Sequence, residues 1–209
     1  MKPVSGPKKP CQDLPDFRHV VETIRKSYSD CRLIAIDGLP CSGKTTLAAA
    51  LGQSLDVNFL HFDDFLLSPS SWPGDIRPLF PFPFFRHKMF FDAVRAIARD
   101  GICSFFPFDW DSMEISGHLH HVRSDRPILV EGVSVLSPEI PSLYDVRIFV
   151  QSDRSSLLEA VCKRDGNLFR EEWETLFIPS ADLYMRTRPE ARSDFLVRGR
   201  GLAALSAGA

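Results

Sequence analysis

Apolar positions along the chain follow two periods, and the alternation between them predicts strands connected by helices. Phe17, Val20 and Ile24 recur at helical spacing, which predicts an amphipathic helix at about residues 15–28. Further helices are predicted after residue 44 and at 90–100, 155–164 and 171–186, the last with a kink or break at Pro179. Short apolar runs predict buried strands at 33–37, 57–62, 127–132, 146–150 and 194–197. Strands that alternate with helices imply a mainly parallel sheet covered on both faces.

Two stretches depart from this alternation. Residues 66–85 are rich in proline and phenylalanine and cannot hold a regular helix. The apolar runs 102–108 and 115–122 are separated by a polar turn region, which predicts a small hairpin or two separate strands. We therefore expect residues 63–125 to form an insertion at the rim of the sheet.

The first predicted strand runs into a glycine-containing segment, Gly38-Leu39-Pro40-Cys41-Ser42-Gly43-Lys44-Thr45-Thr46. The Gly-x-x-x-x-Gly-Lys-Thr spacing between a strand and a helix is typical of a phosphate-binding P-loop. Its two glycines allow backbone N–H groups to turn toward an anion at the positive end of the helix. Lys44 can then contact the β- and γ-phosphates of a nucleotide, and the Thr45 hydroxyl can bind magnesium. We expect the whole segment to bind nucleotide, the alternative being an ordinary glycine turn that begins a helix.

Composition narrows the class of ligand. With 209 residues the chain has the size of one α/β domain, and its formal net charge is −2. Its basic residues are scattered, apart from a short Lys-Pro-rich run at the start, so the sequence shows no electrostatic footprint for nucleic acid. A small anionic ligand in a local positive pocket suits this balance better than a polyanion does.

The cysteines and the chain ends bear on the cellular environment. The five cysteines are odd in number and far apart, without a Cys-x-x-Cys pair, so they predict neither a disulfide framework nor a zinc site and fit a reducing cytoplasm. No apolar run approaches the length of a membrane span, and the start of the chain lacks the apolar segment of a signal peptide. We interpret residues 1–14 as a disordered leader and 201–209 as a flexible tail.

Carboxylates end two of the predicted strands. Asp63 and Asp64 follow the second strand, and Glu131 ends the third. In an open parallel sheet, ligands bind at the carboxyl ends of the strands, so these acids are candidates for chemistry. Glu131 could orient magnesium through water, or it could be a structural acceptor for backbone N–H groups. Asp37, directly before the P-loop, is interpreted as mostly structural.

Four short motifs accompany the P-loop. In chain order they are Phe62-Asp63-Asp64-Phe65, Pro107-Phe108-Asp109, Val130-Glu131-Gly132 and Lys163-Arg164-Asp165. Their order and spacing resemble those of the uridine kinase family, which is close to the nicotinamide riboside kinases and phosphoribulokinases, over about residues 31–200. The resemblance implies a P-loop NTPase fold, with three α/β/α layers around a mainly parallel five-stranded sheet. It also implies a single kinase domain at 15–200 that uses ATP and Mg²⁺.

The resemblance implies roles for residues near the phosphates. Asp63 matches the residue that accepts the proton of the acceptor hydroxyl, whereas the alternative is that it caps the following turn. Together with Lys44 and Arg164 it forms the expected catalytic set. Thr45, Glu131 and Asp63 are the expected magnesium ligands, directly or through water.

Residues 162–172 resemble the family's lid, in which arginines close over ATP. Arg164 and Arg170 are the expected phosphate contacts, because a guanidinium pairs with phosphate oxygens and stays charged. The chain has Val161 and Phe169 at two places where the family has further arginines, so we expect a shorter or weaker lid. For Arg170 the alternative is a solvated position on a helix.

The insertion 63–125 is expected to bind the acceptor. Family members contact the base with a Tyr-Asp pair and a later histidine, and here Phe108-Asp109 stand at the pair and Met113 at the histidine. Histidines follow slightly later, at His118, His120 and His121. They offer no third metal ligand type at useful spacing, which favours a hairpin rim over a metal site. The identity of the base therefore stays open.

Phe84 and Arg86 are further candidates for contacts with the acceptor. Phe84 belongs to a cluster that could stack on a base, which comprises Phe80, Phe82, Phe84 and Phe85. The alternative is that this aromatic loop packs on the domain. Arg86 could reach a ribose or a phosphate.

Together these features predict an ATP- and Mg²⁺-dependent kinase that phosphorylates the primary hydroxyl of a nucleoside such as uridine or cytidine. Nicotinamide riboside, pantothenate and a sugar phosphate are alternative acceptors. A nucleotide-dependent switch or regulatory ATPase is the alternative from another class, although the sequence lacks a guanine-specific Asn-Lys-x-Asp motif. The expected partner is a small molecule, not nucleic acid or a membrane.

Overall fold

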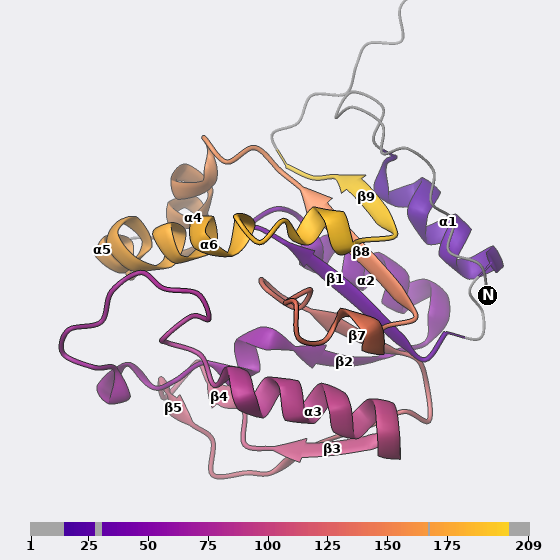
Figure 1. Ribbon diagram of the computed structural model, residues 1–209, viewed down its shortest axis with the longest axis horizontal. Helices are drawn as coiled ribbons and strands as arrows, with labels where there is room; N and C mark the ends of the chain where they lie inside the picture. The colour runs from indigo at the N-terminus through magenta and orange to yellow at the C-terminus, as the bar shows by residue number, and fades with distance from the viewer. Residues whose placement is uncertain (1–14, 28–30, 167, 201–209) are drawn as a thin grey trace, which may run out of the picture.

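A computed structural model of the chain describes residues 15–27, 31–166 and 168–200 (Figure 1). The predicted leader 1–14 and tail 201–209 lie outside the described residues. The helices are α1 (Phe17–Ser27), α2 (Lys44–Leu55), α3 (His87–Asp100), α4 (Leu157–Asp165), α5 (Arg170–Glu172) and α6 (Ile178–Met185). The strands are β1 (Leu33–Gly38), β2 (Asn58–His61), β3 (Ile102–Phe105), β4 (Phe108–Asp109), β5 (Glu114–Ile115), β6 (His120–Arg123), β7 (Ile128–Glu131), β8 (Val146–Gln151) and β9 (Phe195–Arg198).

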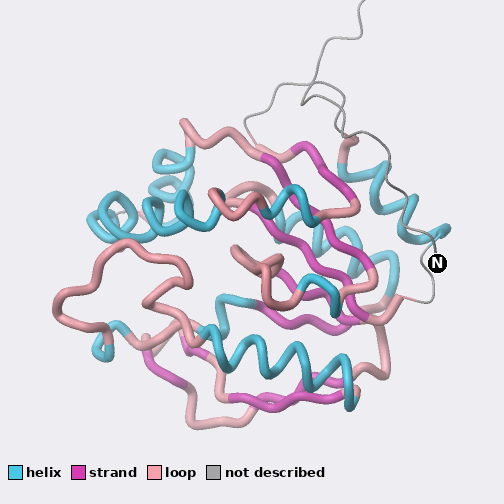
Figure 2. Tube along the Cα trace, viewed as in Figure 1, coloured by secondary structure: helices cyan, strands magenta, loops and turns pink. Residues whose placement is uncertain are grey.

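Five strands form a parallel sheet in the order β2-β7-β1-β8-β9, drawn in magenta at the centre of Figure 2. β1 lies in the middle of the sheet, where Ile36 pairs with Glu131 of β7 on one side and with Ile148 of β8 on the other. Every residue of β1 is buried. The sheet confirms the predicted α/β fold and places the strand that leads into the P-loop at its centre.

Helices cover both faces of the sheet because successive side chains of each strand point to opposite sides. Ile34 and Ile36 of β1 pack with apolar residues of α1 and α2. Leu33 and Ala35 point the other way, toward α3 and Tyr184 of α6. The result is the predicted three-layer α/β/α arrangement.

The segment between β2 and β7 contains the aromatic loop, α3 and an antiparallel hairpin. Phe105 of β3 pairs with His120 of β6, and Phe108 of β4 pairs with Ile115 of β5, so the two apolar runs form one interrupted hairpin. The loop between β2 and α3 holds two short 3₁₀ turns and an isolated antiparallel bridge between Leu66 and Phe85, with no regular helix among its described residues, as its prolines predict. This segment contains residues 63–125, the range expected from the sequence to form an insertion.

The predicted helix 171–186 contains a wide turn in place of a kink. A π-helix, Trp173–Phe177, connects α5 to α6 directly before Pro179. Proline has no N–H to donate to the carbonyl of Thr175, so the regular hydrogen-bond pattern has to change at this point. The wide turn brings the rings of Trp173 and Phe177 into edge-to-face contact, with centroids 5.0 Å apart.

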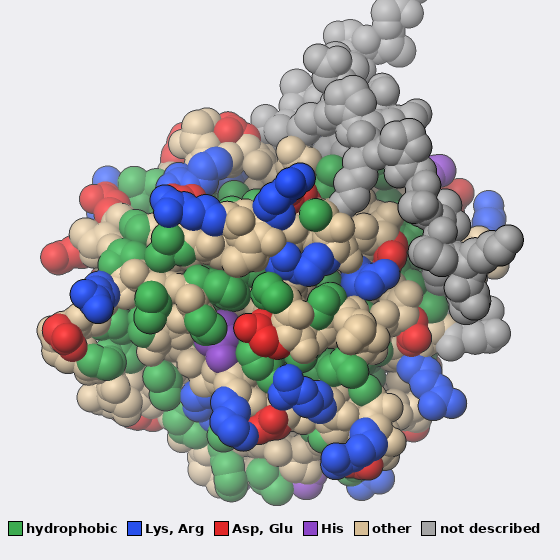
Figure 3. All heavy atoms as spheres, viewed as in Figure 1, with side chains coloured by type: hydrophobic (Ala, Val, Ile, Leu, Met, Phe, Trp, Pro, Cys, Tyr) green, Lys and Arg blue, Asp and Glu red, His purple; other side chains and the backbone are tan. Residues whose placement is uncertain are grey.

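The surface shows no single basic patch on the face drawn in Figure 3, where lysines and arginines are interleaved with acidic side chains. Within the described ranges, none of the helices is long and apolar enough to cross a membrane. The cysteines of these ranges, Cys31, Cys41, Cys103 and Cys162, form no disulfide.

Candidate functional site

A cavity of about 800 Å³ opens at the carboxyl edge of the sheet. The P-loop lines it from Pro40 to Thr46, together with Asp63 after β2 and Glu131 at the end of β7. These strands are neighbours of β1 or of each other, so the parallel topology brings their ends together. The structure thus gathers the predicted P-loop and both predicted carboxylates around one space.

The backbone of the P-loop requires glycine at its two ends. A Cβ on Gly38, whose φ is +152°, would lie 2.5 Å from the carbonyl oxygen of Val150 on β8. Gly43 has a φ of +105° and immediately precedes α2, and no side chain caps that end of the helix. The first N–H groups of α2 therefore lack a side-chain acceptor, as expected where a helix binds an anion.

Lys44, Thr45 and Glu131 meet beside the P-loop. Lys44 is only 7% exposed, and its Nζ donates to the carbonyl oxygen of Leu39 over 3.0 Å and lies 3.9 Å from Oε1 of Glu131. The Thr45 hydroxyl donates to the same Oε1 over 3.5 Å. A hydroxyl and a carboxylate at this distance suit Mg²⁺, which usually binds one or two protein groups together with substrate phosphates and water. The described residues contain no group of three His, Cys, Asp or Glu that could hold a metal unaided.

Glu131 keeps its negative charge although it is buried. Burial acts to raise the pKa of this carboxyl, but the hydrogen bond with His61 and the charge of Lys44 hold it below its usual value. The Nδ1 atom of His61 lies 3.5 Å from Oε2 of Glu131, and this contact raises the pKa of the histidine. Because Oε2 of Glu131 faces His61, its other oxygen, Oε1, faces Lys44 and Thr45.

Asp63 lies in a 3₁₀ turn, Phe62–Phe65, that directly follows β2. Its side chain is open to the cavity but enclosed by protein on the other sides, and burial followed by the negative charge of Glu131 raises its pKa. Lys44, Arg164 and His61 oppose this rise. None of the described residues donates a hydrogen bond to this carboxylate, so the turn-capping alternative has no support in the geometry.

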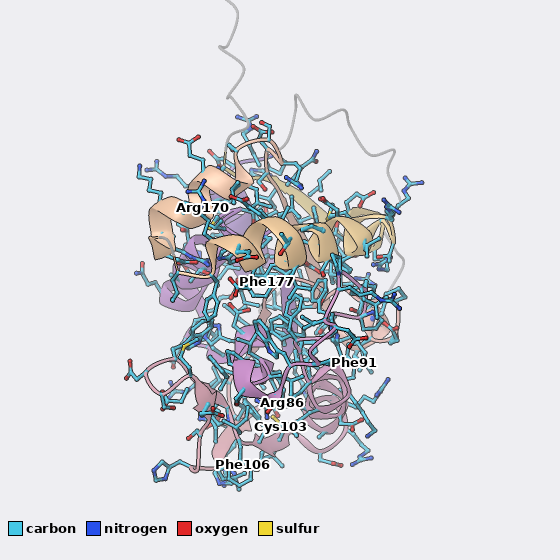
Figure 4. The ribbon with its side chains drawn as sticks, turned by 90° about the vertical axis from the view of Figure 1, so that its left-hand side faces the viewer. Arg86, Phe91, Cys103, Phe106, Arg170 and Phe177 are labelled. Carbon is cyan, nitrogen blue, oxygen red and sulfur yellow. The ribbon has the colours of Figure 1, made fainter. Side chains whose placement is uncertain are left out.

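The lid segment contributes one of its two predicted arginines. Arg164, near the end of α4, lines the cavity, is paired with Asp165 and lies over the ring of Trp173 at 5.9 Å from its centroid. Arg170 does not line the cavity, because its exposed guanidinium pairs with Glu174 one turn further along the helix. Figure 4 shows Phe177 between this helical layer and the insertion, with Arg170 on the upper side of the helix.

Of the predicted acceptor contacts, Asp63, Phe84 and two further rings of the aromatic cluster, Phe82 and Phe85, line the cavity. Arg86 lies outside it, because its guanidinium donates to the backbone carbonyl oxygens of Asp64, Leu66 and Phe106 at 2.7–3.2 Å. The guanidinium therefore connects the loop that follows β2 to the hairpin segment between β3 and β4.

Phe108 and Asp109 also lie outside the cavity. The ring of Phe108 is buried in the core beneath the hairpin. The carboxylate of Asp109 accepts hydrogen bonds from the backbone N–H of Asp111 and the hydroxyl of Ser112, which closes the turn between β4 and β5. The next residue, Trp110, lines the cavity instead.

Several cavity residues have no counterpart among the sequence predictions. They are Trp72 and Trp110 of the insertion, Lys163 of α4, Trp173 and Phe177 of the π-helix, and Arg200 after β9. A usable signal exists for the tryptophans alone: the chain has only three, and all of them line this cavity. Arg200 has no local signal, because it lies in a glycine- and alanine-rich segment after the last strand.

Comparison with known proteins supports the fold. No protein-family model matches the chain. A possible uridine kinase from Bacillus stearothermophilus is similar in structure, with a TM-score of 0.66 and 19% identity over 86% of this chain and 98% of that chain. The chain has the P-loop kinase fold. A candidate fructose transport system kinase from Silicibacter sp. TM1040 is similar to the same degree, with a TM-score of 0.65 and 20% identity over 87% of this chain and 98% of that chain.

The descriptions of the two neighbours differ, since one names uridine and the other a fructose transport system. A shared fold at such low identity leaves the chemistry of the site to be argued from its own residues.

Proposed function

We propose that the protein is an ATP- and Mg²⁺-dependent kinase that transfers the γ-phosphoryl group to the primary hydroxyl of a small molecule. The observation that carries this proposal is the carboxylate of Asp63, which faces the cavity of the P-loop without a hydrogen-bond partner among the described residues. A carboxylate so placed can accept the proton of an alcohol as its oxygen bonds to phosphorus.

The other residues of the site bind the phosphates, neutralise their charge or hold Mg²⁺. The P-loop amides and Lys44 hold the β- and γ-phosphates, and Arg164 neutralises charge on the transferred group. Thr45 and Glu131 would hold Mg²⁺, which spreads the negative charge of the phosphates when it is bound. The proton of the hydroxyl goes to Asp63, the new O–P bond forms at the γ-phosphorus, and ADP leaves with the electrons of the broken bond.

The cavity extends well beyond the phosphates, which favours a kinase over a regulatory ATPase. Its far side is formed by the insertion and by Phe169 and Phe177 of the segment after α4. A nucleotide switch would not need the part of the cavity that the insertion, Phe169 and Phe177 form. We therefore assign residues 63–125 to acceptor binding and 162–172 to the lid.

A nucleoside is the acceptor expected from the sequence, since it combines a primary hydroxyl with a flat base. The geometry supports an acceptor with a hydroxyl group and a flat ring. It gives less support to a pyrimidine base in particular, because Phe108 and Asp109, expected to contact the base, lie outside the cavity.

A coupled ADP-release assay tests the proposal with uridine, cytidine, nicotinamide riboside, pantothenate and fructose as acceptors. We expect acceptor-dependent release that falls at least about a hundredfold in Asp63→Asn, as expected when a positioned base is removed. ATP binding by the same variant, measured by calorimetry, should persist because the P-loop is untouched.

Asp64→Asn is the matched control, because this neighbouring carboxylate does not line the cavity. We expect it to keep most of the activity. Undiminished turnover by Asp63→Asn, or ADP release that ignores every acceptor, would contradict the proposed function.

A further inference from the structure

All three tryptophans of the chain line the cavity. Trp72 of the insertion contacts Phe84 at 6.2 Å and Phe177 at 5.8 Å between ring centroids, and Phe84 lies 4.8 Å from Phe177. Trp110 stands at the opening with 53% of its surface exposed. We call Trp72, Phe84, Trp110 and Phe177 the aromatic wall. Phe84 is only 5% exposed, whereas Trp72, Trp110 and Phe177 each keep part of their surface exposed and can stack on a ring.

The described residues of the insertion contribute no cation to the cavity, and all of its cations come from other elements. Lys44 belongs to the P-loop, Lys163 and Arg164 to α4, and Arg200 is hydrogen bonded to the P-loop carbonyl of Cys41. Arg86, the one cation of the insertion expected to reach an acceptor, is held by three backbone carbonyls outside the cavity. Three of the four wall residues, Trp72, Phe84 and Trp110, belong to the insertion, whose described residues give the cavity no cation to offset the desolvation of an acceptor's phosphate. Arg164 lies over Trp173, whose ring centroid is 5.0 Å from that of the fourth wall residue, Phe177.

Uncharged polar side chains are also lacking at the aromatic wall. Of the described residues that line the cavity, serine and threonine occur only in the P-loop, and asparagine, glutamine, tyrosine and histidine are absent. The indole N–H of Trp72 is already bound to the carbonyl oxygen of Leu67 over 3.2 Å. An acceptor with many hydroxyl groups would leave most of them without partners, which costs free energy for each buried group.

From this arrangement we propose that the acceptor is a hydroxymethyl group carried by an aromatic ring, with few other hydroxyls and no phosphate. The ring stacks on the aromatic wall, and the hydroxymethyl oxygen reaches toward Asp63. The proton passes to Asp63, the oxygen bonds to the γ-phosphorus of ATP, and ADP leaves. This inference narrows the proposed kinase activity and rests on it.

Binding measured without turnover separates this inference from the kinase proposal. Calorimetric titration of the full chain would compare pyridylmethanol, uridine, dideoxyuridine, fructose and fructose monophosphate as probes. Pyridylmethanol and dideoxyuridine are expected to bind more tightly than fructose, and fructose monophosphate is expected to bind least. Quenching of tryptophan fluorescence by the tight probes would place them in this cavity, because every tryptophan lines it.

Trp110→Ala tests the wall itself, since an exposed side chain can be removed without loss of the core. We expect about a tenfold weaker affinity for pyridylmethanol, as for loss of one stacked ring, with the affinity for ATP unchanged. Phe106→Ala is the matched control, because this ring of the same hairpin is 44% exposed and does not line the cavity. It should change neither affinity.

Each outcome decides between the two proposals. Tighter binding of fructose monophosphate than of pyridylmethanol, equal losses in both variants, or failure of every ring alcohol to bind would overturn the inference about the acceptor. Ring alcohols that bind at the tryptophans but never elicit ADP release would support the ligand class and contradict the kinase activity.

Discussion

Arg200 donates a hydrogen bond from Nε to the carbonyl oxygen of Cys41, over 2.8 Å, and its backbone N–H donates to the carbonyl oxygen of Ser42 over 3.0 Å. The N–H groups of a P-loop turn inward to the phosphates, so its carbonyl groups turn outward and need donors of their own. Ser156 fixes the other side of the guanidinium, since its hydroxyl oxygen lies 2.7 Å from Nη1. Arg200 thus supports the P-loop through the carbonyl groups of Cys41 and Ser42.

Removing this support should weaken nucleotide binding selectively. For Arg200→Met we expect the KM for ATP to rise by about tenfold, the effect of losing roughly one charge-assisted hydrogen bond, while the KM for the acceptor stays constant. Initial rates of ADP release at varied ATP and acceptor concentrations would measure both constants. Arg99→Met is the control, because Arg99 pairs with Asp100 on the exposed end of α3. An unchanged KM for ATP in Arg200→Met would show that the P-loop holds its shape alone.

Local patterns were sufficient to predict the sheet and the part of the cavity that the P-loop lines. A strand, a glycine-bounded loop and a helix are contiguous in sequence, so the position of Lys44 follows from spacing alone. Glu131 could be placed because parallel strands end at one edge, and the register that pairs it with Ile36 bears this out.

The acceptor end could not be predicted in the same way. Trp72, Trp110 and Phe177 are far apart in the sequence and meet only through tertiary packing. The Pro-Phe-Asp motif was expected to contact the base, but Phe108 turns into the core and Asp109 closes a turn. Which residue of a two-residue strand faces a ligand depends on the fold around it.

Tyr184 and Asp37 form a buried hydrogen bond between α6 and the end of β1. The same carboxylate accepts backbone N–H groups of Gly38, Ser134 and Leu136 at 2.6–3.1 Å. Tyr184→Phe should lower the free energy of unfolding by about 1–2 kcal/mol, because one donor is lost and three remain. Asp37→Ala should cost more, since three buried N–H groups lose their acceptor together.

Urea denaturation followed by circular dichroism would measure these changes. Tyr144→Phe is a close control, because its buried hydroxyl has no hydrogen-bond partner among the described residues. We expect this variant to be as stable as the parent chain or more so. Equal losses in Tyr184→Phe and Tyr144→Phe would show that the bond to Asp37 contributes nothing.

Glu131→Gln should raise the magnesium requirement of the proposed reaction. The substitution keeps the shape of the side chain but removes the negative charge that lies near Thr45 and Lys44. We expect the Mg²⁺ concentration for half-maximal rate to rise by about tenfold or more, the range seen when a group that orients a metal ligand is replaced. The control is the exposed Glu139→Gln. A variant of Glu131 with the parent's magnesium dependence would leave this residue a purely structural role.

His87 couples the stability of the insertion to pH. Its ring is buried among phenylalanines at the start of α3, and burial lowers its pKa from the ordinary 6.5 to about 4. The neutral ring also accepts a hydrogen bond on Nε2 from the backbone N–H of Phe82 over 2.9 Å, which a protonated nitrogen could not do. The folded chain therefore resists taking up a proton that the unfolded chain binds readily.

The sign of the pH dependence follows from this difference. Between the pKa of about 4 in the folded chain and 6.5 in the unfolded chain, the unfolded state binds more protons, so stability falls as the pH decreases through this window. The loss attributable to His87 is at most about 3 kcal/mol. His87→Gln, which keeps a hydrogen-bond acceptor but does not titrate, should lose that much less stability than the parent chain between neutral pH and pH 4. Urea denaturation at a series of pH values would measure the difference, with the exposed His118→Gln expected to follow the parent curve. Parallel curves for His87→Gln and the parent chain would mean that another group carries the acid sensitivity.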